Sequence, residues 1–252
     1  EKVHSDWMSN ISEFDGVICV SRTVAEEYRR WLDDKMPGRS LRVRIGWSHN
    51  GADLDRSLLT HGVPLGSEQV LKVLHSRPSF LMVGTLEPRK GHTQVLAAFE
   101  RLWQSDLDVN LVIVGKQGWM VEELAGRIRS HCELGKRLFW LEGISDEYLE
   151  SVYGASTCLI AASFGEGFGL PLIEAAQHNL PVLARNIPVF REIAGEHAFY
   201  FEGAAAVDVA SAVQMWLELF AEGRHPTSTN MHWLTWQESA TKLLANILPR
   251  PQ

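Results

Sequence analysis

The stretch "SFLMVGTLEPRKGHTQVLAAFERLW", residues 79–103, decides the fold class of this 252-residue chain. The apolar run at its start ends in Gly84 and has the length of a buried strand. After a polar loop, apolar residues recur at the spacing that lines one face of a helix: Val95, Ala98, Phe99 and Leu102. A strand, a loop and an amphipathic helix in this order predict one β-α unit.

The same unit recurs toward the C-terminus. We expect strands over 109–115, 137–143, 157–163, 181–185 and 198–201, and helices over 121–132, 145–156, 171–178, 188–194 and 206–223. The strands are continuously apolar rather than alternating, which is typical of a parallel sheet with both faces covered. The sequence therefore predicts a doubly wound, Rossmann-like α/β domain.

The first 45 residues carry a smaller β-α-β pattern. Two strands, 14–20 and 41–45, flank a helix over 21–36 with Ser21 at its N-cap. Because so small a piece cannot bury its own faces, we interpret it as the tail of an N-terminal domain. The chain then divides into four parts: the tail 1–45, a turn-rich linker 46–66, the Rossmann-like domain 67–232 and a C-terminal part 233–252, whose helix we expect over 233–248.

Composition excludes several function classes. The net charge of −7 and the scattered basic residues argue against binding to nucleic acid. The three cysteines are far apart, which fits a reducing compartment and gives no disulfide framework or zinc site. The apolar runs are much shorter than the roughly 18–20 residues of a membrane span. We therefore expect a cytoplasmic protein without a metal site.

The candidate ligand-binding segments follow the strands, because doubly wound sheets bind ligands at the carboxyl ends of their strands. In the segment 163–171, three glycines alternate directly before a helix: Gly165, Gly167 and Gly169. Glycine permits positive φ and close approach, and a helix N-terminus attracts phosphate. A glycine-rich turn with a purely structural role is the alternative.

Two cations, Arg89 and Lys90, are expected at the same edge, since they follow the strand that ends at Gly84. Taken alone they would be an exposed basic pair. Together with the glycine-rich segment they favour a diphosphate site.

Two glutamates complete the candidate site. Glu174, expected in the first turn of the helix from 171, suits sugar hydroxyls better than phosphate, as acidic residues do at ribose sites. Glu166 lies in the glycine-rich turn and could contact a second sugar. A glycosidase pair, with carboxyls about 5–9 Å apart, is the alternative, but it would not account for the phosphate features.

Five motifs together carry a family resemblance: "VGTLEPRKGH" (83–92), "LVIVGKQGW" (111–119), "LEGISDEYLESVYGAS" (141–156), "FGEGFGLPLIEAA" (164–176) and "PVLARNIPVFREIAGEHAFYF" (181–201). Residues 79–203 resemble the nucleotide-sugar-binding domain of the retaining GT-B glycosyltransferases of family four, which include mannosyl- and rhamnosyltransferases. The stretch 164–176 is similar to that family's motif of two glutamates separated by seven residues.

The resemblance implies roles for individual residues. Arg89 and Lys90 would hold the diphosphate, Glu174 the ribose, and Glu166 the donor sugar as the catalytic residue. Thr85 departs from the pattern, since many relatives carry arginine there. The remaining donor-binding residues implied by the resemblance are Gly84, Thr85, Gly143, Ile144, Gly167, Phe168, Gly169 and Leu170.

The resemblance also implies a reaction. A sugar, mannose from GDP-mannose in the first instance, would be transferred with retention onto a glycan or lipid-linked acceptor in polysaccharide assembly, without cofactor or metal. Most of the acceptor domain would lie outside residues 1–252, so this chain alone would transfer little sugar. That missing domain could also bring peripheral membrane association, and the last helix would cross back to it. An incomplete nucleotide-sugar-binding module and an epimerase of the same fold are the alternatives.

Overall fold

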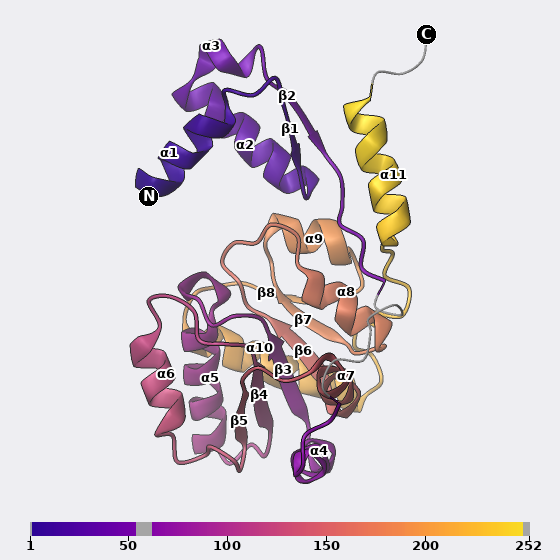
Figure 1. The fold of residues 1–252 in the computed structure, drawn as a ribbon. Helices are drawn as coiled ribbons and strands as arrows, with labels where there is room; N and C mark the ends of the chain where they lie inside the picture. The colour runs from indigo at the N-terminus through magenta and orange to yellow at the C-terminus, as the bar shows by residue number, and fades with distance from the viewer. Residues whose placement is uncertain (1, 54–61, 249–252) are drawn as a thin grey trace. The chain divides into compact units, whose positions relative to one another are not determined.

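The computed structural model describes residues 2–53 and 62–248 (Figure 1). The chain forms two compact units. The sheet unit comprises Leu54–Gly165 and Leu170–Met231, and the terminal unit comprises Glu1–Asp53, Glu166–Gly169 and His232–Gln252. Each unit is described by itself below.

The sheet unit contains six parallel strands in the order β5-β4-β3-β6-β7-β8. Every strand predicted in this region is present, and the doubly wound α/β class is confirmed. The order places β3 and β6 side by side at the centre, so the loops that follow them leave the sheet at the same edge. The strands are β3 (Ser79–Val83), β4 (Asn110–Val114), β5 (Leu138–Leu141), β6 (Cys158–Ala161), β7 (Val182–Arg185) and β8 (Phe199–Phe201).

The helices of the sheet unit follow the predicted alternation, and Ser145 caps α7 by accepting a hydrogen bond from the Tyr148 amide. One helix, α4, and a 3-10 turn, η1, were not predicted. The helices are α4 (Ser67–Ser76), α5 (His92–Gln104), α6 (Glu122–Arg129), α7 (Asp146–Ala155), α8 (Leu170–Gln177), α9 (Pro188–Ala194) and α10 (Ala206–Ala221), and η1 spans Pro88–Lys90.

Three fully buried aromatic side chains fasten helices to the sheet. The ring of Phe80 on β3 meets Phe99 of α5 and Trp216 of α10 edge to face, with centroids 5.6 and 5.5 Å apart. Such pairs add about 0.5–1.5 kcal/mol beyond the burial of their area. The apolar face predicted for α5 therefore points into the core at Phe99, and the helices that flank the carboxyl-end loops pack firmly on the sheet.

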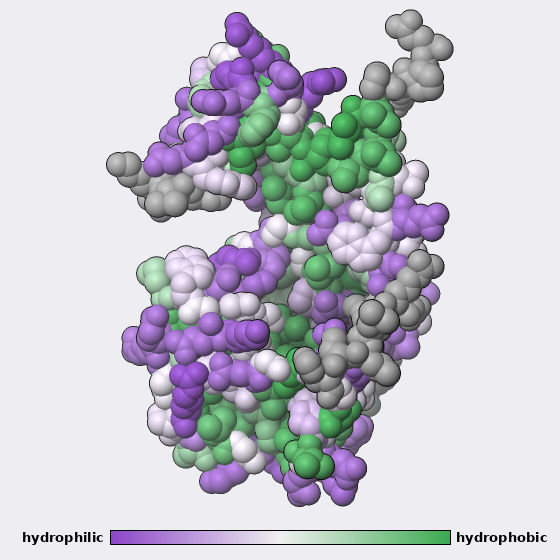
Figure 2. All heavy atoms as spheres, viewed as in Figure 1, coloured by the Kyte–Doolittle hydropathy of each residue, from purple (hydrophilic) through white to green (hydrophobic). Residues whose placement is uncertain are grey.

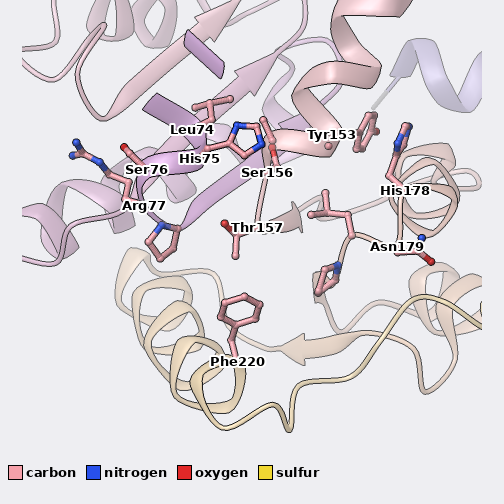
Figure 3. Close-up of a pocket in the computed structure, with 15 residues that line it drawn as sticks. Leu74, His75, Ser76, Arg77, Tyr153, Ser156, Thr157, His178, Asn179 and Phe220 are labelled. Atoms are coloured by element: carbon pink, nitrogen blue, oxygen red, sulfur yellow. The ribbon is translucent and has the colours of Figure 1, made fainter. Parts of the chain in front are cut away.

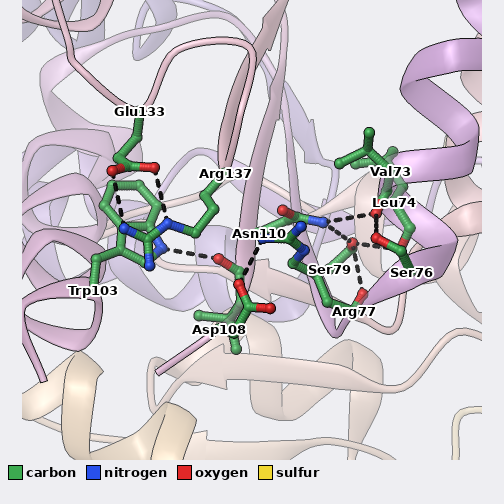
Figure 4. A network of polar contacts seen from close by, with 11 residues as sticks. Val73, Leu74, Ser76, Arg77, Ser79, Trp103, Asp108, Asn110, Glu133 and Arg137 are labelled. Atoms are coloured by element: carbon green, nitrogen blue, oxygen red, sulfur yellow. Dashed lines mark hydrogen bonds and ion pairs between the residues drawn. The ribbon is translucent and has the colours of Figure 1, made fainter. Parts of the chain in front are cut away.

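Polar contacts tie together the amino edge of the sheet (Figure 4). The Asn110 side-chain amide donates to Ser79 Oγ at 2.9 Å, and Ser79 donates to the Leu74 carbonyl at 2.7 Å. Arg77 pairs with Asp108 at 2.6 Å. These bonds fix the turn from α4 into β3 and the start of β4.

The terminal unit contains a parallel pair of strands, β1 (Gly16–Cys19) and β2 (Arg44–Trp47). The predicted N-cap is confirmed, since Ser21 accepts a hydrogen bond from the Val24 amide. The second strand was predicted three residues too early, because a short helix comes first and the amides of Arg42 and Val43 then bond back to the Arg39 carbonyl. The helices are α1 (Lys2–Ile11), α2 (Arg22–Lys35), α3 (Pro37–Ser40) and α11 (Trp236–Ile247).

The last helix, α11, begins at Trp236 rather than at 233. A capping box fixes this start: Thr235 and Glu238 bond reciprocally across the first turn. Hydrophobic residues gather over this helix in Figure 2, and Leu244 and Ile247 are more than half exposed. Among the described residues, no helix is both long and apolar enough to cross a membrane.

The four-part division of the chain remains a prediction. Strand β2 extends two residues into the segment interpreted as a linker. Residues 54–61 of that segment lie outside the described residues.

Candidate functional site

The loops that follow β3 and β6 are joined by two hydrogen bonds. The Phe164 amide donates to the Arg89 carbonyl at 2.8 Å, and Arg89 Nη1 donates to the Gly165 carbonyl at 3.3 Å. The prediction that the cationic segment and the start of the glycine-rich segment lie at one edge is therefore confirmed within the sheet unit.

Close packing of these loops depends on Gly91. Its φ is +77°, and a Cβ atom built there would lie 2.5 Å from the Ala162 carbonyl oxygen. No other residue fits without moving backbone, since real Cβ contacts are never so short. The glycine after Arg89-Lys90 thus lets the cationic loop lie directly against the end of β6.

Lys90 lies over the end of β3. A Cβ atom on Gly84 would be 3.7 Å from Lys90 Cε and 3.8 Å from Nζ, so the ammonium group lies at the carboxyl edge. Arg89 is paired with Glu87, with Nε and Oε2 2.9 Å apart. That carboxylate partly neutralises the charge of Arg89.

The loop after β4 joins the same edge. The Leu86 amide donates to the Lys116 carbonyl at 2.9 Å, and the Gly118 amide donates to the Leu86 carbonyl at 3.0 Å. Thr85 is exposed beside this junction. Lys116, which the sequence did not single out, is therefore a third cation at the edge, and a backbone contact sets its position.

The loop after β5 approaches Lys116. Gly143 has a φ of +62°, and a Cβ atom there would lie 4.0 Å from Lys116 Cε. Gly143 is exposed and Ile144 half-buried. Both predicted base-bordering residues are thus at the carboxyl edge of the sheet unit.

The placement of Glu174 in the first helical turn was wrong. Helix α8 begins at Leu170, so Pro171 is its second residue and Glu174 its fifth. The half-buried Glu174 carboxylate faces α7 instead, where Oε2 accepts a hydrogen bond from the Tyr153 hydroxyl at 2.6 Å. Burial raises the pKa of Glu174, the Tyr153 hydrogen bond opposes this, and the charge of Asp146 adds to it.

The four predicted residues Glu166–Gly169 belong to the terminal unit. Within that unit Ser21 Oγ donates to the Gly167 carbonyl at 2.8 Å, and the Phe168 ring lies 5.2 Å from that of His49. Of the three alternating glycines, only Gly169 has a positive φ, +96°. Among these three glycines, only Gly169 therefore adopts a backbone conformation that favours glycine over other residues.

Arg185, the last residue of β7, was missed by the sequence analysis. It is buried, its Nε donates to the Ala162 carbonyl at 3.0 Å, and its other nitrogens donate to the Gly203 carbonyl and to Gln94. The Phe164 ring lies over it, 4.1 Å from the guanidinium carbon. A basic residue that ends an apolar strand was the only signal in the sequence. Arg185 ties the ends of β6, β7 and β8 to α5.

The part of the chain that the structure describes contains no group of three or more histidine, cysteine or carboxylate side chains that could hold a metal ion. Three cations lie at the carboxyl edge of the sheet unit, Arg89, Lys90 and Lys116, together with the Glu87 carboxylate that pairs with Arg89.

The six-stranded parallel sheet covered by helices is an α/β architecture that GT-B glycosyltransferases share. Residues 67–229 match the model of the family "Glycosyl transferases group 1", and the chain belongs to that family. It is similar in fold to Anabaena Alr3699/HepE in complex with UDP and glucose (TM-score 0.70, 15% identity, 92% of this chain and 62% of that one). It is also similar to a sucrose-phosphate synthase from Thermosynechococcus elongatus (TM-score 0.73, 22% identity, 96% and 60%).

Two curated relatives are mannosyltransferases. The serotype-specific mannosyltransferase WbdA of Escherichia coli is 51% identical over 245 residues, 96% of this chain and 30% of WbdA. The O-antigen chain mannosyltransferase B of Escherichia coli is 32% identical over 120 residues, 46% of this chain and 30% of that protein. The matched region thus covers less than a third of the length of each of these relatives.

Proposed function

We propose that this chain is the donor-binding portion of a retaining mannosyltransferase that takes mannose from GDP-mannose to a glycan or lipid-linked acceptor in polysaccharide assembly. The observation that carries the proposal is the 51% identity to a mannosyltransferase over 96% of the chain. The joined cationic and glycine-rich loops agree with it.

The chemistry assigned to the carboxyl edge is stabilisation of the departing diphosphate. As the sugar–phosphate bond breaks, negative charge grows on the leaving GDP. Lys90 and Arg89 would bind that charge, and the backbone amides at the start of α8 near Leu170 would add the positive end of the helix dipole. Cations and oriented amides would thus replace a metal ion, and the nucleotide sugar is a substrate rather than a cofactor.

The remaining roles concern the sugar and the base. Glu174 would accept hydrogen bonds from the ribose hydroxyls, and Gly143 and Ile144 would border the base. Glu166 would contact the donor sugar, beside backbone groups from Gly167 to Leu170. Cytoplasmic location with peripheral membrane association also belongs to the proposal.

Calorimetric titration of the 252-residue chain tests the donor assignment. We expect GDP and GDP-mannose to bind at least about tenfold more tightly than UDP and UDP-glucose, which corresponds to roughly 1.4 kcal/mol. Guanosine is the control for the diphosphate and should bind hardly at all. A preference for UDP-glucose would contradict the proposed donor, and equal binding of guanosine and GDP would contradict the diphosphate site.

A further inference from the structure

The Tyr153 hydroxyl reaches from α7 to Glu174 Oε2 on α8, at 2.6 Å. Tyr153 is 2% exposed, so its side chain lies in the protein interior. We propose that Tyr153 is a positioning residue that holds the Glu174 carboxylate in the orientation needed to accept the ribose hydroxyls of the donor nucleotide. This inference rests on the proposed function, in which Glu174 binds ribose.

The bond is strong enough to orient a side chain. Its length lies in the short range of hydrogen bonds from a hydroxyl to a carboxylate, which are about twice as strong as neutral ones. A carboxylate offers about four acceptor positions on its two oxygens. Tyr153 takes one at Oε2, so Glu174 retains acceptor capacity for a ligand while losing rotational freedom.

Tyr153 is itself held in place. Its ring stacks on that of His178, just beyond the end of α8, with centroids 5.0 Å apart and planes 4° apart. Figure 3 shows the two rings side by side in the wall of a pocket of about 530 Å³. The stacking contact restricts the rotation of the Tyr153 ring, and this also restricts the position of its hydroxyl group.

The electrostatic setting requires such a partner. Burial raises the pKa of Glu174, and the Asp146 charge at the start of α7 raises it further, whereas the Tyr153 hydrogen bond lowers it. Burial also raises the pKa of Tyr153 well above 10, so the phenol stays protonated and can donate at neutral pH. Tyr153 therefore favours the ionised carboxylate, which is the better hydrogen-bond acceptor.

The test compares GDP with 2′,3′-dideoxy-GDP, which lacks the hydroxyls that Glu174 would bind. The wild-type chain should bind GDP at least about tenfold more tightly, since hydrogen bonds to charged groups are worth that much. In Tyr153→Phe this preference should fall to about threefold or less. The affinity for dideoxy-GDP should stay within about twofold, because the phenyl ring keeps its stacking.

Tyr148→Phe is the matched control, since Tyr148 is buried on the same helix and the substitution removes the same atom. It should keep the full preference. A second variant, His178→Ala, keeps the hydroxyl but removes the stacked ring, and it should lower the preference at least about twofold. Lowering the pH should abolish the preference for GDP at a higher pH in Tyr153→Phe than in wild type.

The outcomes separate the two proposals. If the wild-type chain does not bind GDP or does not distinguish it from dideoxy-GDP, the proposed site itself is wrong. If the wild type distinguishes them and Tyr153→Phe does so equally well, only the positioning role is wrong. Equal weakening of both nucleotides in Tyr153→Phe would likewise overturn that role, because it would indicate a general structural effect.

Discussion

The carbonyl oxygen of Arg89 accepts a hydrogen bond from the backbone amide of Phe164 at 2.8 Å. This bond joins the loop after β3 to the loop after β6, and the same two strands pair in the centre of the sheet. Because backbone holds the two loops together, side chains on them can be shortened without releasing the loops. Substitutions at this edge therefore test charge and contact separately from folding.

Lys90→Ala is expected to weaken diphosphate binding at least about tenfold, since a charge-assisted hydrogen bond is worth about 1.5–3 kcal/mol. The ammonium group lies at the end of β3 beside Gly84, at the carboxyl edge. Calorimetry with GDP measures the loss. Lys72→Ala, which removes an exposed cation from α4, should leave the affinity unchanged. Equal affinity of Lys90→Ala and wild type would remove Lys90 from the site.

Donor binding is expected to need no divalent cation. The proposed partners of the diphosphate are Lys90 and Arg89, which carry positive charge, and backbone amides, which present the positive ends of their dipoles. Titrations of GDP with excess chelator should therefore match those with magnesium or manganese. A loss of more than about tenfold on chelation, roughly 1.4 kcal/mol, would show that a metal contributes.

Gly91→Ala is expected to destabilise the sheet unit and weaken GDP binding. The new Cβ would lie 2.5 Å from the Ala162 carbonyl, on a backbone with φ of +77°. Clash and left-handed strain together should lower the free energy of unfolding by about 2 kcal/mol or more. Urea denaturation measures this.

The matched control for this substitution is Gly126→Ala in α6, where a Cβ atom would have no neighbour within 4 Å. It should raise the free energy of unfolding by about 0.4–1 kcal/mol, because alanine favours helix and restricts the unfolded chain. If both variants have the same stability, the close approach at Gly91 does not constrain the loop.

The stability of the chain is expected to fall between about pH 6.5 and pH 4 because of His92. The side chain is 2% exposed, and neither ring nitrogen has a hydrogen-bond partner among residues 2–53 and 62–248. Burial, followed by the charge of Lys90, lowers the pKa of His92 to about 4. Between about pH 6.5 and pH 4 His92 is protonated in the unfolded chain but stays neutral in the folded chain. The free energy of unfolding therefore decreases as the pH falls through that window.

The contribution of His92 amounts to about 3.4 kcal/mol at most, since each pKa unit corresponds to 1.36 kcal/mol. His92→Leu should therefore flatten the decline in urea midpoint between pH 7.5 and pH 4.5, while changing the midpoint at pH 7.5 much less. A decline as steep as that of the wild type would show that other groups cause the acid sensitivity.

The sequence by itself determined the parallel α/β architecture, because the alternation of apolar runs and helical periodicity is a local property. It also placed Arg89 and Lys90 at the same edge of the sheet as the start of the glycine-rich segment 163–171, since the carboxyl ends of parallel strands meet at one edge. The motifs around these residues pointed to the glycosyltransferase family that the comparison confirmed. The roles of the individual site residues remain predictions.

The tertiary structure alone decided how side chains on different elements meet. The first turn of α8 could not be located to the residue, because helix ends depend on surrounding contacts. Consequently only the structure showed Glu174 in the second turn, bonded to Tyr153. Arg185 likewise has partners that are 18 to 91 residues away in the chain. Such contacts depend on burial and on packing between elements that are distant in the sequence. Local sequence periodicity therefore cannot predict them.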